Sequence, residues 1–209
     1  MNGYIFNRLE ELQNIEKINL SKGRIKEVLE ALKILRGAEK AATLNVTGPF
    51  TIISALVEPA MFYKELRKNK DAVEGFIQII EDGVTDYILE GIKCGATIIS
   101  YADPAGSMDI VGPKNFKEIV GRRTYNILKR IEPHLDHTIM HLCGKLSSGL
   151  EIMGYIETKA ISISKDIKYG DAIVEMKDCM KAVKFIGNAC IKRTPLVMKQ
   201  PNIWEINIK

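Results

Sequence analysis

The sequence predicts an α/β fold in which short parallel strands alternate with amphipathic helices. Stretches of about five apolar residues recur between longer segments with helical periodicity. The chain also lacks the glycine-rich fingerprint that opens a dinucleotide-binding domain. Repeated βα units without that fingerprint favour part of a (β/α)8 barrel. At 209 residues the chain is shorter than the roughly 250 residues of a complete barrel.

Five strands and several helices are expected from periodicity and from the residues that punctuate it. The helix over 21–37 is predicted to begin at Ser21, a favourable N-cap, and to stop at Gly37. Further helices are predicted over 50–57, from Pro59, over 71–93 with Gly95 as its end, from Pro113 to Pro133, over 146–153 and over 169–177. Strands are predicted over 41–46, 97–101, 138–143, 160–164 and 183–187.

No regular pattern follows Arg193, and the first residues precede any strand. We therefore expect one domain over 1–209 with atypical tails at 1–20 and 194–209.

The composition is that of an ordinary globular protein, with 46% hydrophobic and 27% charged residues. Its 30 basic and 26 acidic residues are dispersed, which argues against a nucleic-acid-binding protein. No apolar run approaches the roughly 18–20 residues of a membrane-spanning helix, and the first residues lack the pattern of a signal peptide. A cytoplasmic location is expected, with the four cysteines as free thiols or metal ligands.

The stretch from Thr138 to Gly144 carries a histidine and a cysteine two positions apart. Because side chains at i and i+2 of a strand share a face, His141 and Cys143 are expected to project together. Imidazole and thiolate are zinc ligands, so this pair is half of a zinc site. The alternative is a buried cysteine beside a hydrogen-bonded histidine.

Other polar residues fall at the ends of other predicted strands. Gly48, Asp103 and Cys190 each follow a strand. In a βα barrel these carboxyl ends converge on one mouth, where the chemistry of such folds gathers. Their coincidence with the His-x-Cys pair favours a functional site.

Four short motifs resemble the uroporphyrinogen decarboxylase superfamily. They are Asn-Val-Thr-Gly-Pro-Phe-Thr at 45–51, Tyr-Ala-Asp-Pro-Ala-Gly at 101–106, His-Leu-Cys-Gly at 141–144 and Gly-Asn at 187–188. Together they look most like the methylcobamide:coenzyme M methyltransferase branch, and the likeness runs from Ser21 to Cys190.

The resemblance implies a (β/α)8 barrel of TIM type, of which this chain supplies about five parallel strands, strands three to seven. It implies zinc held by a His-x-Cys pair and a later cysteine, with His141 and Cys143 as the first two ligands. The family's third ligand would follow the missing last strand, so Cys190 is the nearest substitute here. It further implies catalytic use of Asp103, whose alternative role is to bond a backbone turn, and cofactor binding by Gly48 and Asn188.

The activity implied is zinc-dependent methyl transfer from a methylated corrinoid, carried by a partner corrinoid protein, to a thiol such as coenzyme M. Zinc would lower the pKa of the acceptor thiol. A uroporphyrinogen decarboxylase is less well matched, because its tyrosine and serine positions correspond to Ala55 and Asp103. The remaining alternative is a truncated, non-catalytic barrel that acts as a binding or scaffold protein.

A partial barrel leaves strand edges and one sheet face uncovered. We therefore expect a homo-oligomer or a complex with a companion chain.

Overall fold

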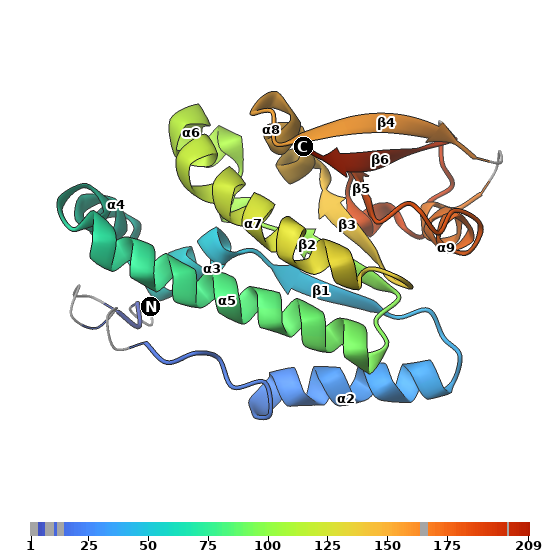
Figure 1. Ribbon diagram of the computed structural model, residues 1–209, viewed down its shortest axis with the longest axis horizontal. Coiled ribbons are helices and arrows are strands. Elements are labelled where there is room, and N and C mark those ends of the chain that lie inside the picture. The colour runs from blue at the N-terminus through green and yellow to red at the C-terminus, as the bar shows by residue number, and fades with distance from the viewer. Residues whose placement is uncertain (1–3, 7–10, 12–14, 164–166, 200) are drawn as a thin grey trace.

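The computed structural model describes the chain except for residues 1–3, 7–10, 12–14, 164–166 and 200. Within the described residues, six strands form one sheet in the order β1-β2-β3-β5-β6-β4 (Figure 1). The strands are β1 (Thr43–Thr47), β2 (Ile98–Ala102), β3 (Ile139–Cys143), β4 (Ile156–Ser162), β5 (Phe185–Ala189) and β6 (Asn202–Ile208).

Strands β1, β2, β3 and β5 are parallel neighbours, joined by helical crossovers. Strand β6 runs antiparallel to both β5 and β4. These elements confirm the predicted α/β class. The sheet is mixed, with four parallel strands where about five were expected, and is consistent with a partial TIM-type barrel.

The order of the last three strands differs from the expected series of parallel strands. The strand predicted over 160–164 is β4, which covers 156–162 and lies at the sheet edge; residue 164 falls outside the described residues. Its continuous antiparallel ladder with β6 joins Ile156 to Ile208 and Ser162 to Asn202. β4 therefore does not pair with β3. The neighbour of β3 is β5, which is followed by β6 and then β4.

The described helices lie before β1 and in the connections between the strands. They are α2 (Gly23–Gly37), α3 (Pro49–Leu56), α4 (Pro59–Lys68), α5 (Lys70–Cys94), α6 (Met108–Asn115), α7 (Arg122–Ile131), α8 (Gly144–Ile152) and α9 (Tyr169–Cys179). Short helical segments are η1 (Pro104–Gly106), η2 (Phe116–Gly121), η3 (Glu132–His134) and η4 (Ile191–Arg193).

Two local details depart from the predicted helices. The side chain of Ser21 does not cap α2, whose N-cap is Lys22. The predicted helix from Pro113 to Pro133 starts just after a kink at Gly112, whose φ is 78°, and keeps a helical backbone, but it changes type because η2 is a π-helical segment between α6 and α7. By contrast, Gly95 ends α5 in the left-handed conformation, as its position predicts.

Two apolar clusters hold the sheet. The main core joins alternate residues of the parallel strands, including Leu44, Ile99 and Leu142, to helical residues such as Ile88 of α5. The α9 core joins other strand residues to α9; its buried members are Ile98, Ile139, Ile186, Ile203, Val183, Tyr169, Ala172, Ile173 and Met176. Figure 1 places α9 beside β5 and the long β4–β6 pair.

Among the described helices, none combines the length and the apolarity needed to cross a bilayer.

Candidate functional site

The four sequence motifs come together in two pairs at the carboxyl ends of the parallel strands. The residues after β1 contact those after β2, and the end of β3 pairs with the end of β5. This arrangement follows from the parallel register, which aligns Thr47 with Ala102 and Cys143 with Ala189.

Asp103 binds the beginning of α3. Its Oδ2 accepts a hydrogen bond from the backbone N–H of Phe50 at 3.0 Å. Its Oδ1 accepts from the backbone N–H of Thr51 at 2.7 Å and from the Thr51 hydroxyl at 2.6 Å. Gly48 permits this close approach, since a Cβ at that position would lie 2.5 Å from the Asp103 Oδ2.

The Asp103 carboxyl is buried, with 3% of the residue exposed. Burial raises its pKa, and the hydrogen bonds from Thr51 and the backbone offset part of that effect. These contacts match the turn-bonding role that the sequence offered as the alternative; catalysis by Asp103 stays a prediction. They also give Gly48 a packing role, while its contact with a cofactor stays a prediction.

The second pair joins α8 to the end of β5 through Ser147. The Ser147 hydroxyl lies 2.9 Å from the Asn188 side-chain Oδ1 and 2.9 Å from the Asn188 backbone nitrogen. Asn188 has a left-handed φ of 55°, which asparagine tolerates better than most residues. A Cβ on Gly187 would lie 2.9 Å from that of Ser147, so this contact requires a glycine.

His141 lies on β3, and its side chain is buried against Tyr169 of α9. It is 1% exposed, and its Nε2 lies 3.0 Å from the hydroxyl of Tyr169. Burial lowers the pKa of the His141 imidazole to about 4, so the ring is neutral at pH 7. Its Nδ1 is a buried nitrogen with no hydrogen-bond partner in the described part of the chain.

Cys143 has different neighbours from His141. The register between β3 and β5 shifts between these two residues, and Cys143, at the start of α8, is half-buried against the main core. Tyr169, the partner of His141, belongs to the α9 core. The two-residue repeat of a regular strand does not predict this register shift.

No group of three or more His, Cys, Asp or Glu side chains is placed to hold a metal ion within the described residues. Cys190 is exposed and does not form such a group with His141 and Cys143. The donors still suit zinc in type, since His141 offers a nitrogen without a partner and Cys143 a free thiol. The described residues thus provide two donors of the kind a zinc site needs, without a complete set.

Three residues of this site were not singled out from the sequence. Thr51 lies inside a recognised motif, so its hydroxyl could have been considered with Asp103. Ser147 had a weaker signal, as the first hydroxyl after the His-x-Cys-Gly motif. Tyr169 carried no signal for this role, since its contact with His141 spans 28 residues.

The chain is similar to methyltransferases of Methanosarcina species. It is 28% identical over 172 residues to the methylcobamide:CoM methyltransferase MtaA of Methanosarcina barkeri, which covers 81% of this chain and 49% of that protein. It is also 28% identical over 172 residues to MtbA of Methanosarcina mazei, another methylcobamide:CoM methyltransferase, covering 80% of this chain and 50% of the relative. The chain therefore spans about half the length of these relatives.

A solved structure supports the same relationship. A methyltransferase from Methanosarcina mazei superposes with a TM-score of 0.52 at 28% identity, covering 59% of this chain and 36% of that one. The family model described as uroporphyrinogen decarboxylase (URO-D) matches residues 2–196. The chain therefore belongs to the uroporphyrinogen decarboxylase family.

Proposed function

We propose that this protein takes part in methyl transfer from a methylated corrinoid to a small thiol of the coenzyme M type. The observation that supports it most strongly is the similarity to methylcobamide:CoM methyltransferases over about four fifths of the chain, which includes the His-x-Cys pair at the end of β3. A partner corrinoid protein is the proposed source of the methyl group.

His141 and Cys143 are the proposed zinc ligands in this chain, with Cys190 as a third candidate. Bound zinc would supply Lewis acidity that makes the acceptor thiol a thiolate at neutral pH. The His141 imidazole is already neutral, the form that binds a metal. Its contact with Tyr169 restricts the ring's orientation.

The other motif residues are proposed to hold the shape of the site. Asp103 fixes the start of α3, and the Ser147–Asn188 contacts join α8 to β5. In the proposed transfer, the thiol sulfur would form a bond to the methyl carbon of the corrinoid substrate as the cobalt–carbon bond breaks. The electron pair of that bond would stay with the corrinoid, and the thiol proton would pass to solvent.

We further propose that a second copy or a companion chain contributes to the site. Strands β1 and β4 are the edges of the sheet as described, and alternate residues of β1 (Thr43, Asn45 and Thr47) are exposed. An open parallel edge can pair with another chain. Such a chain could also bring the remaining metal ligands.

The first test measures zinc per chain. Protein reconstituted with zinc and freed of excess metal is analysed by elemental mass spectrometry together with its molar mass in solution. We expect stoichiometric zinc that is lost in His141→Ala and in Cys143→Ser. Cys179→Ser, which removes an exposed thiol at the end of α9, is the matched control and should retain the metal.

The second test follows demethylation of methylcobalamin by its absorbance, with 2-mercaptoethanesulfonate as the thiol. Activity that requires zinc and is lost in Cys143→Ser supports the proposal. Activity unchanged in both His141→Ala and Cys143→Ser contradicts the assigned ligands. Metal-free, inactive protein in every oligomeric state would favour the non-catalytic binding role, and turnover of a porphyrinogen would favour the decarboxylase.

A further inference from the structure

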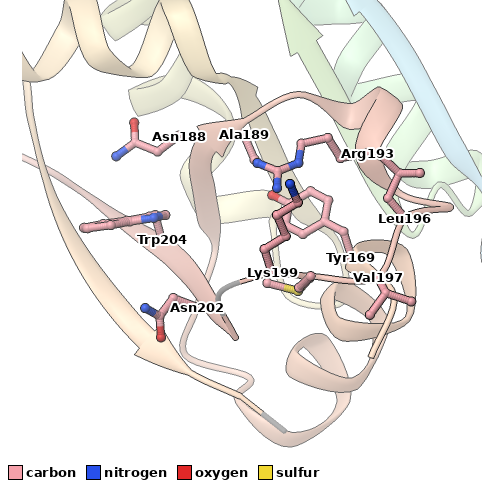
Figure 2. Close-up of a pocket in the computed structure, with 10 residues that line it drawn as sticks. Tyr169, Asn188, Ala189, Arg193, Leu196, Val197, Lys199, Asn202 and Trp204 are labelled. Carbon is pink, nitrogen blue, oxygen red and sulfur yellow. The ribbon is translucent and has the colours of Figure 1, made fainter. Parts of the chain in front are cut away.

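A cavity of about 280 Å³ lies where the end of β5, the start of α9 and β6 meet. Its lining combines an apolar wall, which includes Leu196, Val197 and Met198, with cationic and amide side chains. Figure 2 shows the side chains of Arg193 and Lys199 directed toward the same part of the cavity as the ring of Tyr169.

The charge of this cavity has one sign. Arg193 and Lys199 supply two positive charges, and no Asp or Glu is among the ten described residues that line it. Among the described residues, no ion pair joins either side chain to a carboxylate. Two cations gathered in one hollow without a counter-charge attract an anion.

The backbone around Arg193 is held independently of its side chain. The Arg193 N–H donates to the carbonyl of Cys190 at 2.9 Å, and its carbonyl accepts from the N–H of Leu196 at 2.8 Å. The segment also binds α9, since the N–H of Tyr169 donates to the carbonyl of Leu196 at 3.0 Å. The guanidinium is therefore presented from a fixed turn and remains available to a ligand.

Tyr169 connects the cavity to the interior. Tyr169 is 4% exposed, and its hydroxyl contacts the Nε2 of His141. Tyr169 and Arg193 both line the cavity, so the hydrogen-bond partner of His141 forms part of its wall.

We propose that this cavity binds a small organic anion: a carboxylate, sulfonate or phosphate head between Arg193 and Lys199, with a short apolar stem against the Leu196–Met198 wall. A planar guanidinium suits such heads because it can donate two parallel hydrogen bonds. The cavity volume lies just below the range of roughly 300–1,000 Å³ that is usual for ligand sites, which favours a small ligand.

The test is calorimetric titration of the 209-residue chain at constant ionic strength with propionate, 1-propanesulfonate and propyl phosphate, and with propionamide as the neutral analogue. No metal, corrinoid or thiol is present, so the outcome does not depend on methyl transfer. Trp204, the only tryptophan of the chain, lines the cavity, and its fluorescence reports whether binding occurs there. The three head groups show which anion class is preferred.

We expect saturable binding of at least one anion at one site per chain, with a matching change in Trp204 fluorescence and no binding of propionamide. Arg193→Gln and Lys199→Gln should each weaken binding about tenfold or more, the loss of a charge-assisted hydrogen bond. Lys192→Gln removes an adjacent exposed cation that does not line the cavity and should change affinity less than about twofold.

Three results would overturn the proposal: no saturable binding of any of the anions, equal binding of propionamide, or equal weakening by Lys192→Gln. Binding heat without a change in Trp204 fluorescence would place the anion elsewhere and also overturn it. Circular dichroism checks the fold of each variant. If Arg193→Gln does not fold, Arg193→Lys and Lys199→Gln decide the outcome.

Discussion

The Nε2 of His141 lies 3.0 Å from the hydroxyl of Tyr169, and this is the only hydrogen bond of the imidazole within the described residues. It ties the histidine of the His-x-Cys motif to α9, an element outside all four motifs. Buried polar groups that lose their partner are costly, because neither water nor protein replaces it.

Removing that hydroxyl should destabilise the protein. Tyr169→Phe leaves both ring nitrogens of His141 without a partner, and we expect the free energy of unfolding to fall by about 1–3 kcal/mol. Urea denaturation measures it. The control is Tyr125→Phe, whose exposed hydroxyl donates to the carbonyl of Lys209. Equal losses of unfolding free energy in the two variants would show that the buried hydrogen bond stabilises the fold no more than the exposed one.

The stability of metal-free protein should depend on the protonation of His141. The pKa of His141 is about 4 in the folded chain and 6.5 for the free side chain. Between these values the unfolded chain binds a proton that the folded chain does not, so stability is complete above pH 6.5 and falls as the pH decreases toward 4. The full effect is on the order of 3 kcal/mol.

Unfolding free energies of wild type and His141→Gln, measured in urea between pH 7 and pH 4.5, isolate this contribution from other groups. The variant should have the shallower dependence on pH. His137→Gln, at an exposed position, is the matched control and should follow the wild type. Parallel curves for wild type and His141→Gln would refute the shifted pKa.

Gly48 should not tolerate a side chain. A Cβ there would meet the Asp103 carboxylate at 2.5 Å, so Gly48→Ala must displace the group that binds α3, at a cost of about 1–3 kcal/mol. A Cβ at Gly75, within α5, would meet no atom within 4 Å, so Gly75→Ala should raise the free energy of unfolding by about 0.5–1 kcal/mol. Thermal unfolding of both variants gives the comparison, and a neutral Gly48→Ala would contradict the observed packing.

A buried ion pair between α5 and α7 should be sensitive to the loss of one partner. Arg123 Nη1 lies 2.9 Å from Glu81 Oε2, and the two side chains are 8% and 2% exposed. Glu81→Ala leaves a buried guanidinium with fewer partners and should cost about 3 kcal/mol. Asp109→Asn breaks the ion pair with Lys145. The Lys145 and Asp109 side chains are 73% and 69% exposed, so the free energy of unfolding should change by less than about 0.5 kcal/mol. Equal effects in denaturant would rule out a special role for burial.

Local patterns in the sequence determined most of the helices and the four parallel strands. Pro59 opens α4 and Gly95 closes α5, because proline suits a first helical turn and glycine suits a left-handed end. Strands β2 and β3 and the first half of β5 are mostly apolar and buried, whereas β1, at the sheet edge, alternates buried Leu44 and Val46 with exposed residues. Gly48, Asp103 and Cys190 were also placed correctly, because each directly follows a recognisable strand, β1, β2 and β5 respectively.

Only the tertiary structure decided which strands pair and which side chains meet. β6 lies between β5 and β4 because its backbone completes a long antiparallel ladder with β4, a choice that depends on segments about 40 residues apart rather than on local periodicity. The register shift after His141 gives Cys143 a separate environment, and α9 brings Tyr169 to the imidazole. Such contacts arise from the packing of distant elements, which the order of residues in a single strand or helix does not contain.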